Sequence, residues 1–376
     1  MQIVFDYQIF VLQQEGGISR YFLELAQRLP RLFDDTTATV LAPYFISPLL
    51  ENARKSGQVN VIGRKIPSFP GKHRFLPAIN RLAGRSVVRV LQPDLLHETY
   101  YAELPVSSVC PRILTVYDMI HERFPEHSTG PDLHVSRLKA QAVSRADHVI
   151  AISNTTRDDL MELLNVAPGK ITVIPLASAL AKPPPGKDKI NDGRPYLLYV
   201  GARGGVKNFT TLLIAYSQSS VLRSGFDLIC VGGGKFSSRE KKTLRDSGLN
   251  ERVRQLEADD ALLAALYTHA ALFVYPSLYE GFGLPLLEAM RCGCPVACSN
   301  AGSMPEIAGD GAMFFDPDAP EEVQSVLESI VLSEYLADTL RMRGYEQERK
   351  FSWEQCVSRT AELYRLVVTG NKMSTP

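Results

Sequence analysis

Long apolar runs, a disulfide pattern and a net charge are all missing from this sequence, and each absence excludes a class of protein. No uninterrupted apolar run reaches the length of about 18 residues that a membrane-spanning helix requires. The 41 Lys and Arg residues balance 41 Asp and Glu residues, so the composition does not favour a dedicated nucleic-acid binder. Six cysteines in 376 residues, without any repeat period, do not form the framework of a small secreted domain.

The amino terminus and the cysteines both favour a cytoplasmic location. Met1 to Phe10 is typical of a short apolar strand and has neither a cationic leader nor a small-residue cleavage site, so we expect no signal peptide. Cys292, Cys294 and Cys298 lie close together in sequence but lack a Cys-x2-Cys spacing and a nearby histidine. We therefore expect reduced, buried thiols and no metal at these positions.

Apolar, strand-like segments alternate with amphipathic segments along nearly the whole chain, which is typical of parallel sheets with crossover helices. A proline- and lysine-rich break at 182–189 cannot join a sheet. We therefore predict an α/β fold with two Rossmann-like, doubly wound domains, at residues 1–178 and 196–351, joined by a linker at 179–195. A helix within 352–376 is expected to return to the first domain, and ligands are expected in a cleft at the carboxyl ends of the strands.

The predicted elements follow from these alternating segments. The strands of the first domain are expected at Gln2 to Asp6, Thr37 to Leu41, Val59 to Ile62, Leu95 to His97, Ile113 to Tyr117, His148 to Ile152 and Ile171 to Ile174. Those of the second domain are expected at Tyr196 to Gly201, Asp227 to Val231, Leu272 to Tyr275 and Pro295 to Ser299, and the clearest helices are Gly17 to Leu29 and Pro131 to Ala146.

The most informative stretch, Tyr275 to Val296, indicates a strand, a glycine loop, a helix and another strand. Pro285 suits the first turn of a helix because its missing N–H would have no partner there. The free amides and the partial positive charge of that helix end favour a phosphate. Glu280 and Glu288 both face the loop, and a carboxylate beside a phosphate is favourable only if it accepts hydrogen bonds, as from sugar or ribose hydroxyls. The stretch therefore predicts a site for a sugar attached to a phosphate.

With these residues the chain resembles the retaining glycosyltransferases of family 4, which have the two-domain GT-B fold, and the resemblance covers nearly the whole length. It implies that Glu280 lies against the donor sugar and that Glu288 binds the ribose hydroxyls. It also implies that the backbone of Phe282, Gly283 and Leu284 contacts sugar and phosphate.

A second loop supplies cations at the end of the first strand of the second domain. Arg203 and Lys207 follow Gly201 there, and a departing diphosphate requires two such charges. The family has a Gly-x-Arg and a Lys-Asn at this point, although a solvated basic loop is the plainer alternative.

Two further loops and one strand edge are expected to approach the donor or the acceptor. The resemblance places Gly16, Gly17 and Arg20 in the first-domain loop near the β-phosphate and the acceptor. Gly232 and Gly233 indicate a loop of close approach to the nucleotide, and the strand edge that ends at Leu256 is where the base should lie.

The acceptor side is expected around Tyr117 and Asp118, where many family members have His-Asp. Tyr117 can donate a hydrogen bond to a sugar hydroxyl but cannot be a cation near neutral pH. His121 is a substitute for the missing histidine, and Asp118 either orients the acceptor or caps a turn. His97, at another strand end, is expected to line the cleft as a substrate contact.

The segment from Asn52 to Pro93 holds nine Lys or Arg residues and no acid. It is either a solvated face or a surface for peripheral contact with an anionic membrane or a lipid-pyrophosphate acceptor at the inner face of the membrane.

The resemblance implies retaining transfer of a hexose from a nucleotide diphosphate sugar to a saccharide or glycolipid in polysaccharide assembly, with neither cofactor nor metal. A UDP-hexose such as UDP-glucose is favoured over GDP-mannose, although no residue decides between them. A sugar phosphorylase, a nucleotide-sugar epimerase and a catalytically silent nucleotide-sugar-binding partner are the alternatives.

Overall fold

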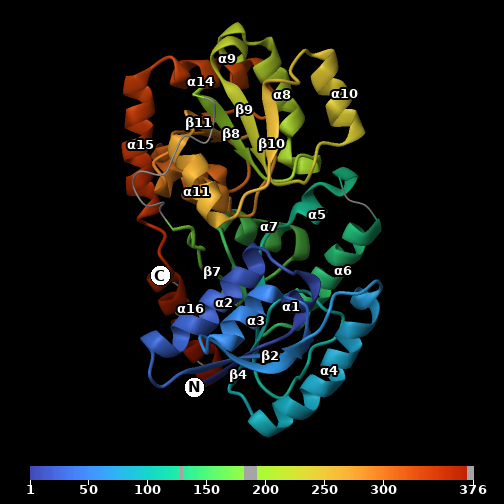
Figure 1. Cartoon of the computed structure of the whole chain (residues 1–376). Coiled ribbons are helices and arrows are strands. Elements are labelled where there is room, and N and C mark those ends of the chain that lie inside the picture. The colour runs from blue at the N-terminus through green and yellow to red at the C-terminus, as the bar shows by residue number, and fades with distance from the viewer. Residues whose placement is uncertain (128–129, 182–192, 371–376) are drawn as a thin grey trace. The chain divides into compact units, whose positions relative to one another are not determined.

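The computed structural model describes residues 1–127, 130–181 and 193–370, and the chain divides into two compact units. The first unit comprises Met1–Leu176 with Trp353–Pro376, and the second comprises Ala177–Ser352 (Figure 1). Residues 182–192 of the expected linker and the end of the chain from residue 371 lie outside the described residues.

The first unit is built on a parallel sheet of seven strands in the order β3-β2-β1-β4-β5-β6-β7, and it confirms every strand predicted there. Its strands are β1 (Gln2–Phe5), β2 (Thr37–Phe45), β3 (Asn60–Lys65), β4 (Leu95–Glu98), β5 (Arg112–Val116), β6 (His148–Ala151) and β7 (Ile171–Val173).

Parallel pairing requires long connections, and helices supply them except between β4 and β5, which residues 99–111 link without a helix. The helices are α1 (Gln8–Leu12), α2 (Gly17–Leu32), α3 (Pro48–Lys55), α4 (Lys72–Leu91), α5 (Ile120–Arg123), α6 (Gly130–Arg145) and α7 (Asn154–Leu164), with the 3-10 turns η1 (Pro125–His127) and η2 (Pro168–Lys170). In the part of the chain that the structure describes, we find no helix with the length and apolar character needed to cross a membrane.

The last helix, α16 (Trp353–Thr369), belongs to the first unit although 176 residues of the second unit precede it. It packs beside α2, where the rings of Tyr21 and Trp353 lie 6.3 Å apart and the Arg28 guanidinium lies 5.9 Å from the Trp353 ring (Figure 1). The chain therefore leaves the first unit once and returns to complete it.

The second unit contains a parallel sheet of six strands in the order β10-β9-β8-β11-β12-β13. Its strands are β8 (Tyr196–Val200), β9 (Asp227–Val231), β10 (Val253–Leu256), β11 (Leu272–Tyr275), β12 (Val296–Ser299) and β13 (Met313–Phe315). Its helices are α8 (Phe209–Gln218), α9 (Ser220–Gly225), α10 (Ser238–Asp246), α11 (Asp260–His269), α12 (Leu284–Arg291), α13 (Met304–Ala308), α14 (Pro320–Val331) and α15 (Glu334–Glu348), with η3 (Gly205–Lys207) and η4 (Gly309–Gly311).

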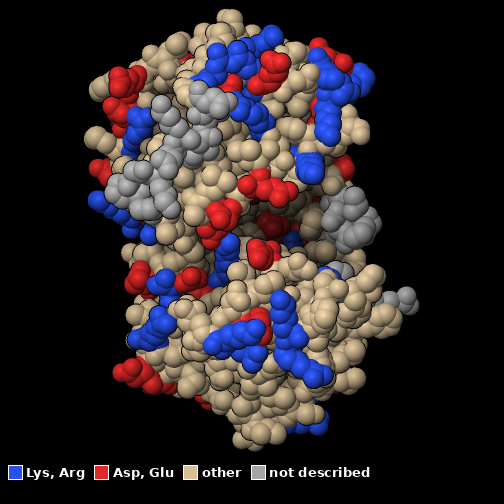
Figure 2. Space-filling view, viewed as in Figure 1, with Lys and Arg blue, Asp and Glu red and all other residues tan. Residues whose placement is uncertain are grey.

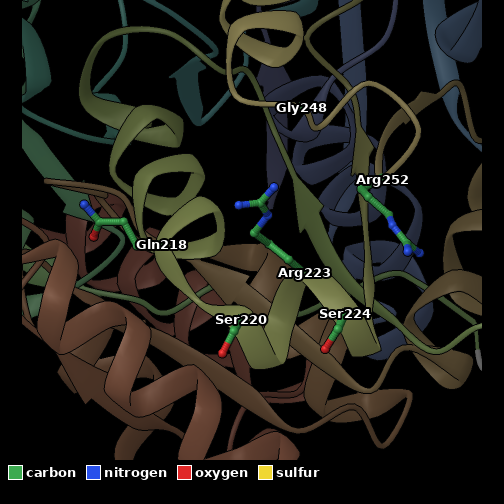
Figure 3. A pocket seen from close by; sticks show the side chains of 6 residues that line it. All are labelled: Gln218, Ser220, Arg223, Ser224, Gly248 and Arg252. Carbon is green, nitrogen blue, oxygen red and sulfur yellow. The ribbon is translucent and has the colours of Figure 1, made fainter.

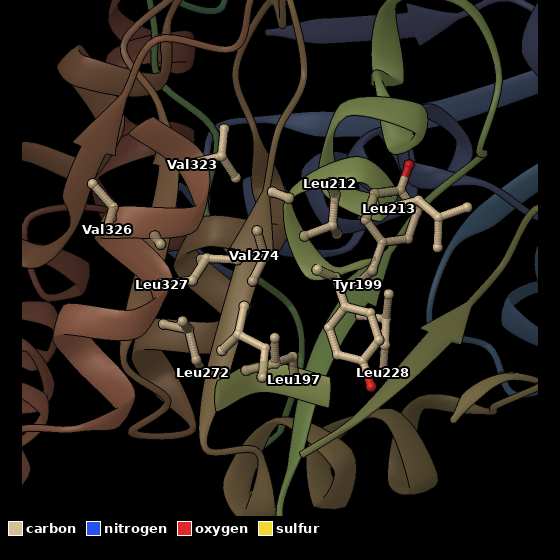
Figure 4. Close-up of a cluster of buried hydrophobic side chains, with 14 of the residues drawn as sticks. Leu197, Tyr199, Leu212, Leu213, Leu228, Leu272, Val274, Val323, Val326 and Leu327 are labelled. Atoms are coloured by element: carbon tan, nitrogen blue, oxygen red, sulfur yellow. The ribbon is translucent and has the colours of Figure 1, made fainter. Parts of the chain in front are cut away.

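Buried aliphatic side chains hold the helices of the second unit on its sheet. Leu197, Leu228 and Leu272 on the strands are fully buried, and they pack with Leu212 of α8 and Leu327 of α14 (Figure 4). Burying one such side chain contributes about 1.5–3 kcal/mol. This core fixes the strand ends from which the site loops leave.

The strand order of each sheet reverses at one place. The chain runs outward from β1 to β3 and restarts beside β1 at β4, and it runs outward from β8 to β10 and restarts beside β8 at β11. The loops at the carboxyl ends of these paired strands diverge, which is where doubly wound sheets bind ligands. The two switch points, β1/β4 and β8/β11, are therefore the places to look for sites.

The cysteines are free thiols, as the sequence predicted. Cys292, Cys294 and Cys298 are buried, as are Cys230 and Cys356, and only Cys110 is partly accessible. Burial raises the pKa of the thiols of Cys230, Cys294, Cys298 and Cys356, which keeps these four protonated and unreactive.

Candidate functional site

Two predicted site residues meet at the switch point of the second sheet. The loop after β8 carries Lys207, and the loop after β11 carries Glu280. The Lys207 Nζ lies 2.7 Å from Oε1 and 2.8 Å from Oε2 of Glu280. The carboxylate side chain is 9% exposed and the lysine side chain 27%. Two oppositely charged side chains that are 73 positions apart in sequence thus form an ion pair, with the carboxylate largely buried and the ammonium partly exposed.

Two serines that the sequence analysis did not identify hold Glu280 and its loop, one through the side chain and one through the backbone. Ser277 donates to Glu280 Oε1 at 2.7 Å, and Ser303 donates to the carbonyls of Glu280 and Phe282, both at 2.9 Å. Gly302 has a φ of 57°, and a Cβ there would lie 2.9 Å from the Glu280 nitrogen. The segment after β12 therefore sets the position of the Glu280 loop.

The helix predicted after this loop is confirmed as α12. Gly283, at φ 95° in the left-handed region, precedes it, and Pro285 stands in its first turn. Its N-terminal end has neither a side-chain cap nor an acid in the first turn, and Leu284 is half-buried there. Glu288, one turn on, accepts a hydrogen bond from Tyr267 of α11 at 3.2 Å. A phosphate suits the N-terminal end of α12, and the hydroxyls of a ribose suit Glu288.

Phe282 points its ring into the protein. It is 3% exposed and meets Phe351 edge-on, with 5.8 Å between ring centroids. Only its backbone is left for the ligand contact that the family resemblance implies.

Arg203 is bound to the glycine loop after β9. Its guanidinium donates to the carbonyls of Gly232 at 2.7 Å, Gly233 at 3.4 Å and Gly234 at 2.9 Å, and its Nε donates to Glu240 at 2.7 Å. The side chain is 4% exposed. All three glycines have positive φ, which turns their carbonyls toward the guanidinium. Arg203 thus positions the glycine loop, and its role as a diphosphate clamp stays a prediction.

Gly201 and Leu256 lie at the same edge of the second sheet. The Gly201 nitrogen donates to the Val231 carbonyl at 2.9 Å, and its φ is 143°. Leu256 is the last residue of β10, the outermost strand on that side. Their contacts with a nucleotide stay predictions.

In the first unit, Gly16 precedes α2, and Gly17 is its first residue. The first turn of α2 has neither a side-chain cap nor an acid, and Arg20 is half-buried beside it. This is the arrangement that the predicted anion-facing loop requires.

The segment after β5 carries the predicted acceptor residues and one unexpected lysine. Asp118 accepts a hydrogen bond from the Ile120 nitrogen at 3.1 Å, so it caps a turn, and its side chain is 33% exposed. Lys139 of α6 is 1% exposed and donates to the Asp118 carbonyl at 2.8 Å and to Glu122 at 2.7 Å. Tyr117 is 8% exposed, and its buried hydroxyl has no hydrogen-bond partner among the described residues. His121 is half-buried on α5.

The expectation that His97 contacts substrate is wrong. The side chain is fully buried, and its two ring nitrogens lie 2.5 Å from the Tyr364 hydroxyl and 2.8 Å from the Thr115 hydroxyl. Burial lowers the pKa of His97 to about 3. The returning helix α16 supplies Tyr364 and covers the strand end, so His97 is a core residue that joins α16 to the sheet.

A polar pocket of about 410 Å³ lies at the other edge of the second sheet (Figure 3). Arg223, Ser220 and Gln218 precede β9, and Gly248 and Arg252 precede β10. This is the amino-terminal edge, whereas ligands of doubly wound sheets bind at the carboxyl ends. Arg252 is paired with Asp227 at 3.4 Å. The pocket is therefore separate from the Lys207–Glu280 site.

The basic segment is partly neutralised by its own neighbourhood. Glu51, directly before it, pairs with Arg54 at 2.9 Å and Lys55 at 3.3 Å. Basic side chains gather over α3 and β2 in Figure 2. On α4, Phe75, Ile79 and Leu82 are 57%, 46% and 62% exposed.

Residues 1–127, 130–181 and 193–370 contain no group of three or more His, Cys, Asp or Glu side chains that could hold a metal ion.

Comparison with known families matches both halves of the chain. The model of Glycosyltransferase Family 4 matches residues 15–177, and that of Glycosyl transferases group 1 matches residues 185–350. O-antigen chain mannosyltransferase B of Escherichia coli is 28% identical over 373 residues, which cover 93% of this chain and 96% of that protein.

Solved structures agree on the fold. Sucrose-phosphate synthase from Thermosynechococcus elongatus superposes with a TM-score of 0.79 at 20% identity, over 98% of this chain and 99% of that one. Anabaena HepE in complex with UDP and glucose has a TM-score of 0.74 at 19% identity, over 97% of this chain and 99% of that one.

Proposed function

Because the chain belongs to glycosyltransferase family 4, we propose that it transfers a hexose from a nucleotide diphosphate sugar to a saccharide or lipid-linked saccharide in polysaccharide assembly. The observation that carries this proposal is the Lys207–Glu280 pair at the β8/β11 switch point, beside the uncapped start of α12. The ammonium and the N-terminal end of the helix suit the diphosphate, and the carboxylate suits sugar hydroxyls.

Mannose is the sugar that the relatives favour. O-antigen chain mannosyltransferase B, a relative that aligns along almost the whole chain, is a mannosyltransferase. The UDP complexes of HepE, at 19% identity, bear on the fold alone. We therefore take GDP-mannose as the first candidate donor and keep UDP-glucose, which the sequence analysis favoured, as the second.

We propose a front-face transfer that retains the anomeric configuration and requires no metal. The bond from the anomeric carbon to the phosphate oxygen breaks, the acceptor oxygen bonds to that carbon on the same face, and the acceptor proton passes to the leaving phosphate oxygen. Lys207 and the N-terminal end of α12 would stabilise the diphosphate charge. Arg203 would contribute by holding the loop of Gly232 to Gly234 in place. Glu280 would hold the sugar hydroxyls.

Thermal unfolding with GDP, UDP, ADP, TDP and their sugar forms, each with and without chelator, tests the donor site. A ligand at 100 times its Kd adds about 2.7 kcal/mol to the free energy of unfolding. Stabilisation by one nucleotide family, unchanged by chelator, identifies the base. If no nucleotide stabilises the protein, the proposed donor site is contradicted.

Product analysis separates the alternatives that share this fold. Dependence on free phosphate identifies a sugar phosphorylase, and inversion at C2 without acceptor identifies an epimerase. Binding without hydrolysis or transfer identifies a silent partner. An α-linked product from an α-linked donor, seen by NMR, supports retention.

We further propose that α4 contacts the cytoplasmic face of an anionic membrane. Phe75, Ile79 and Leu82 recur at helical spacing on one exposed face, with Arg85 and Arg89 also exposed on the helix. Co-sedimentation with phosphatidylglycerol vesicles should be lost when the three apolar residues are replaced by serine. Equal binding of the triple variant and the parent would overturn this contact.

A further inference from the structure

The first sheet also has a cavity at its switch point, and neither the predicted donor residues nor the predicted acceptor residues line it. Its volume is about 480 Å³, within the range of about 300–1,000 Å³ typical of small-molecule sites. Tyr7 in the turn after β1 and Gln8 at the start of α1 line it, and the loop after β4 supplies Tyr100 to Leu104. Because β1 and β4 are adjacent where the strand order reverses, this is where a ligand of the first unit is expected.

The walls of this cavity are fixed by buried contacts. Tyr7 donates to the Pro77 carbonyl of α4 at 2.8 Å, which ties two walls together. Arg145 pairs with the fully buried Glu98 at 2.6 Å and donates to the Ala102 carbonyl at 2.6 Å. The cavity is thus preformed, which reduces the entropy that a ligand must lose on binding.

The lining combines aromatic faces with a few polar groups. Tyr100 and Tyr101 pack with ring centroids 4.5 Å apart, and Tyr101 is 6% exposed. The polar lining consists of an amide, a cation, an acid and an imidazole, supplied by Gln8, Arg81, Glu103 and His134. The cation and the acid balance one another, which favours a neutral ligand over a phosphate.

A saccharide fits this lining better than a hydrocarbon chain. A hydrocarbon would remove water from Arg81 and Glu103 without replacing their hydrogen bonds, which is costly. Sugar hydroxyls both donate and accept, and the apolar C–H faces of a pyranose ring can pack on a tyrosine ring. Aromatic walls with a small number of polar groups are typical of sites that fix the orientation of a ligand.

The cavity is linked to the segment proposed to hold the accepting sugar. Tyr101 accepts a hydrogen bond from the Tyr117 nitrogen at 3.5 Å, and the Lys139 Nζ lies 5.6 Å from the Tyr101 ring. Lys139 in turn bonds to the Asp118 carbonyl at 2.8 Å. We propose that the cavity binds the sugar units of the acceptor that precede the accepting residue, with Tyr100 as the stacking face and Arg81 as a hydroxyl donor.

This proposal rests on the proposed transferase function but can be tested apart from it. Full-length protein would be titrated with mannotriose, maltotriose and chitotriose by calorimetry, without donor. We expect at least one trisaccharide to bind, and Tyr100→Ala and Arg81→Ala to weaken it about tenfold. Tyr100→Phe keeps the ring and should stay within about twofold, as should Arg85→Ala, one turn along α4 and outside the cavity.

Activity then shows whether the cavity serves the acceptor. Tyr100→Ala should raise KM for a trisaccharide acceptor about tenfold and leave KM for the donor and for a monosaccharide acceptor unchanged. Binding of no trisaccharide, equal binding by Arg81→Ala and Arg85→Ala, or occupancy by farnesyl phosphate instead would overturn the assignment. If nucleotides fail to stabilise the protein while a trisaccharide binds through Tyr100, the transferase proposal fails and the saccharide site stands.

Discussion

Lys207 and Glu280 form an ion pair across the switch point of the second sheet, with the lysine nitrogen within 2.8 Å of both carboxylate oxygens. Ser277 also donates to Glu280 Oε1, so the carboxylate is held from two sides. A diphosphate beside Lys207 would share the ammonium with this carboxylate. The pair therefore couples the group proposed to bind phosphate to the group proposed to bind sugar.

Replacing either Lys207 or Glu280 should also impair its partner, because the two side chains act as a pair. We expect Lys207→Ala and Glu280→Gln each to lower kcat at least about tenfold. The double variant should lose less than the two single losses combined, because each single change already breaks the pair. Steady-state kinetics of the four proteins measures this coupling.

Stability measurements provide the control for this cycle. Removing Lys207 leaves a carboxylate that is 9% exposed without its cation, which should cost about 1–3 kcal/mol. Kinetic effects that combine as independent factors would contradict the coupling.

Arg203 should not tolerate lysine. A lysine keeps the charge but lacks the planar fork that reaches three carbonyls and Glu240. We expect Arg203→Lys to lose at least about tenfold in kcat/KM for the donor, close to the loss in Arg203→Ala. Arg239→Lys, on the exposed start of α10, is the matched control. If Arg203→Lys keeps nearly full activity, the guanidinium acts by charge alone, as in the clamp prediction.

Gly302 should be needed for the position of the Glu280 loop. A Cβ at residue 302 would lie 2.9 Å from the Glu280 nitrogen and 3.1 Å from its carbonyl oxygen. Gly302→Ala should therefore lower kcat/KM at least about tenfold, since a small displacement of a positioned group is costly. Gly248 has a similar φ of 66°, but a Cβ there would meet only the Arg223 guanidinium, at an ordinary contact distance of 3.9 Å, so Gly248→Ala carries only the backbone cost of about 1–2 kcal/mol. Equal activity in both variants would show that the close approach to Glu280 does not matter.

Local patterns in the sequence predicted the fold and the Tyr275 to Val296 segment well, because strand alternation, Pro285 and the glycines act within a few residues of one another. The roles of Ser277, Ser303 and Tyr267 could not be predicted, since their partners are set by packing. Ser303, for example, meets the Glu280 carbonyl 23 positions away.

The surroundings of two predicted site residues, His97 and Arg203, could not be predicted for the same reason. His97 ends a strand at the carboxyl edge, which favoured a ligand contact, but α16 returns from 267 positions away and covers it. Arg203 stands in a loop that predicts an exposed cation, but the three positive-φ glycines after β9 turn their carbonyls to its guanidinium. The electrostatic environment of both side chains depends on segments that no local pattern indicates.

His97 should make the first unit less stable in mild acid. Its pKa is about 3 when folded and 6.5 in the unfolded chain, so below pH 6.5 the unfolded state binds a proton that the folded state excludes. The free energy of unfolding should therefore fall by up to about 1.4 kcal/mol per pH unit between pH 6.5 and 3, and be restored above pH 6.5.

Urea unfolding followed by the fluorescence of Trp353, the one tryptophan of the chain, reports on the first unit. His97→Gln should flatten this pH dependence relative to the parent, because the other titrating groups, His148 among them, are common to both proteins. Parallel pH profiles for the two proteins would mean that His97 is protonated in the folded state and is not sealed by α16.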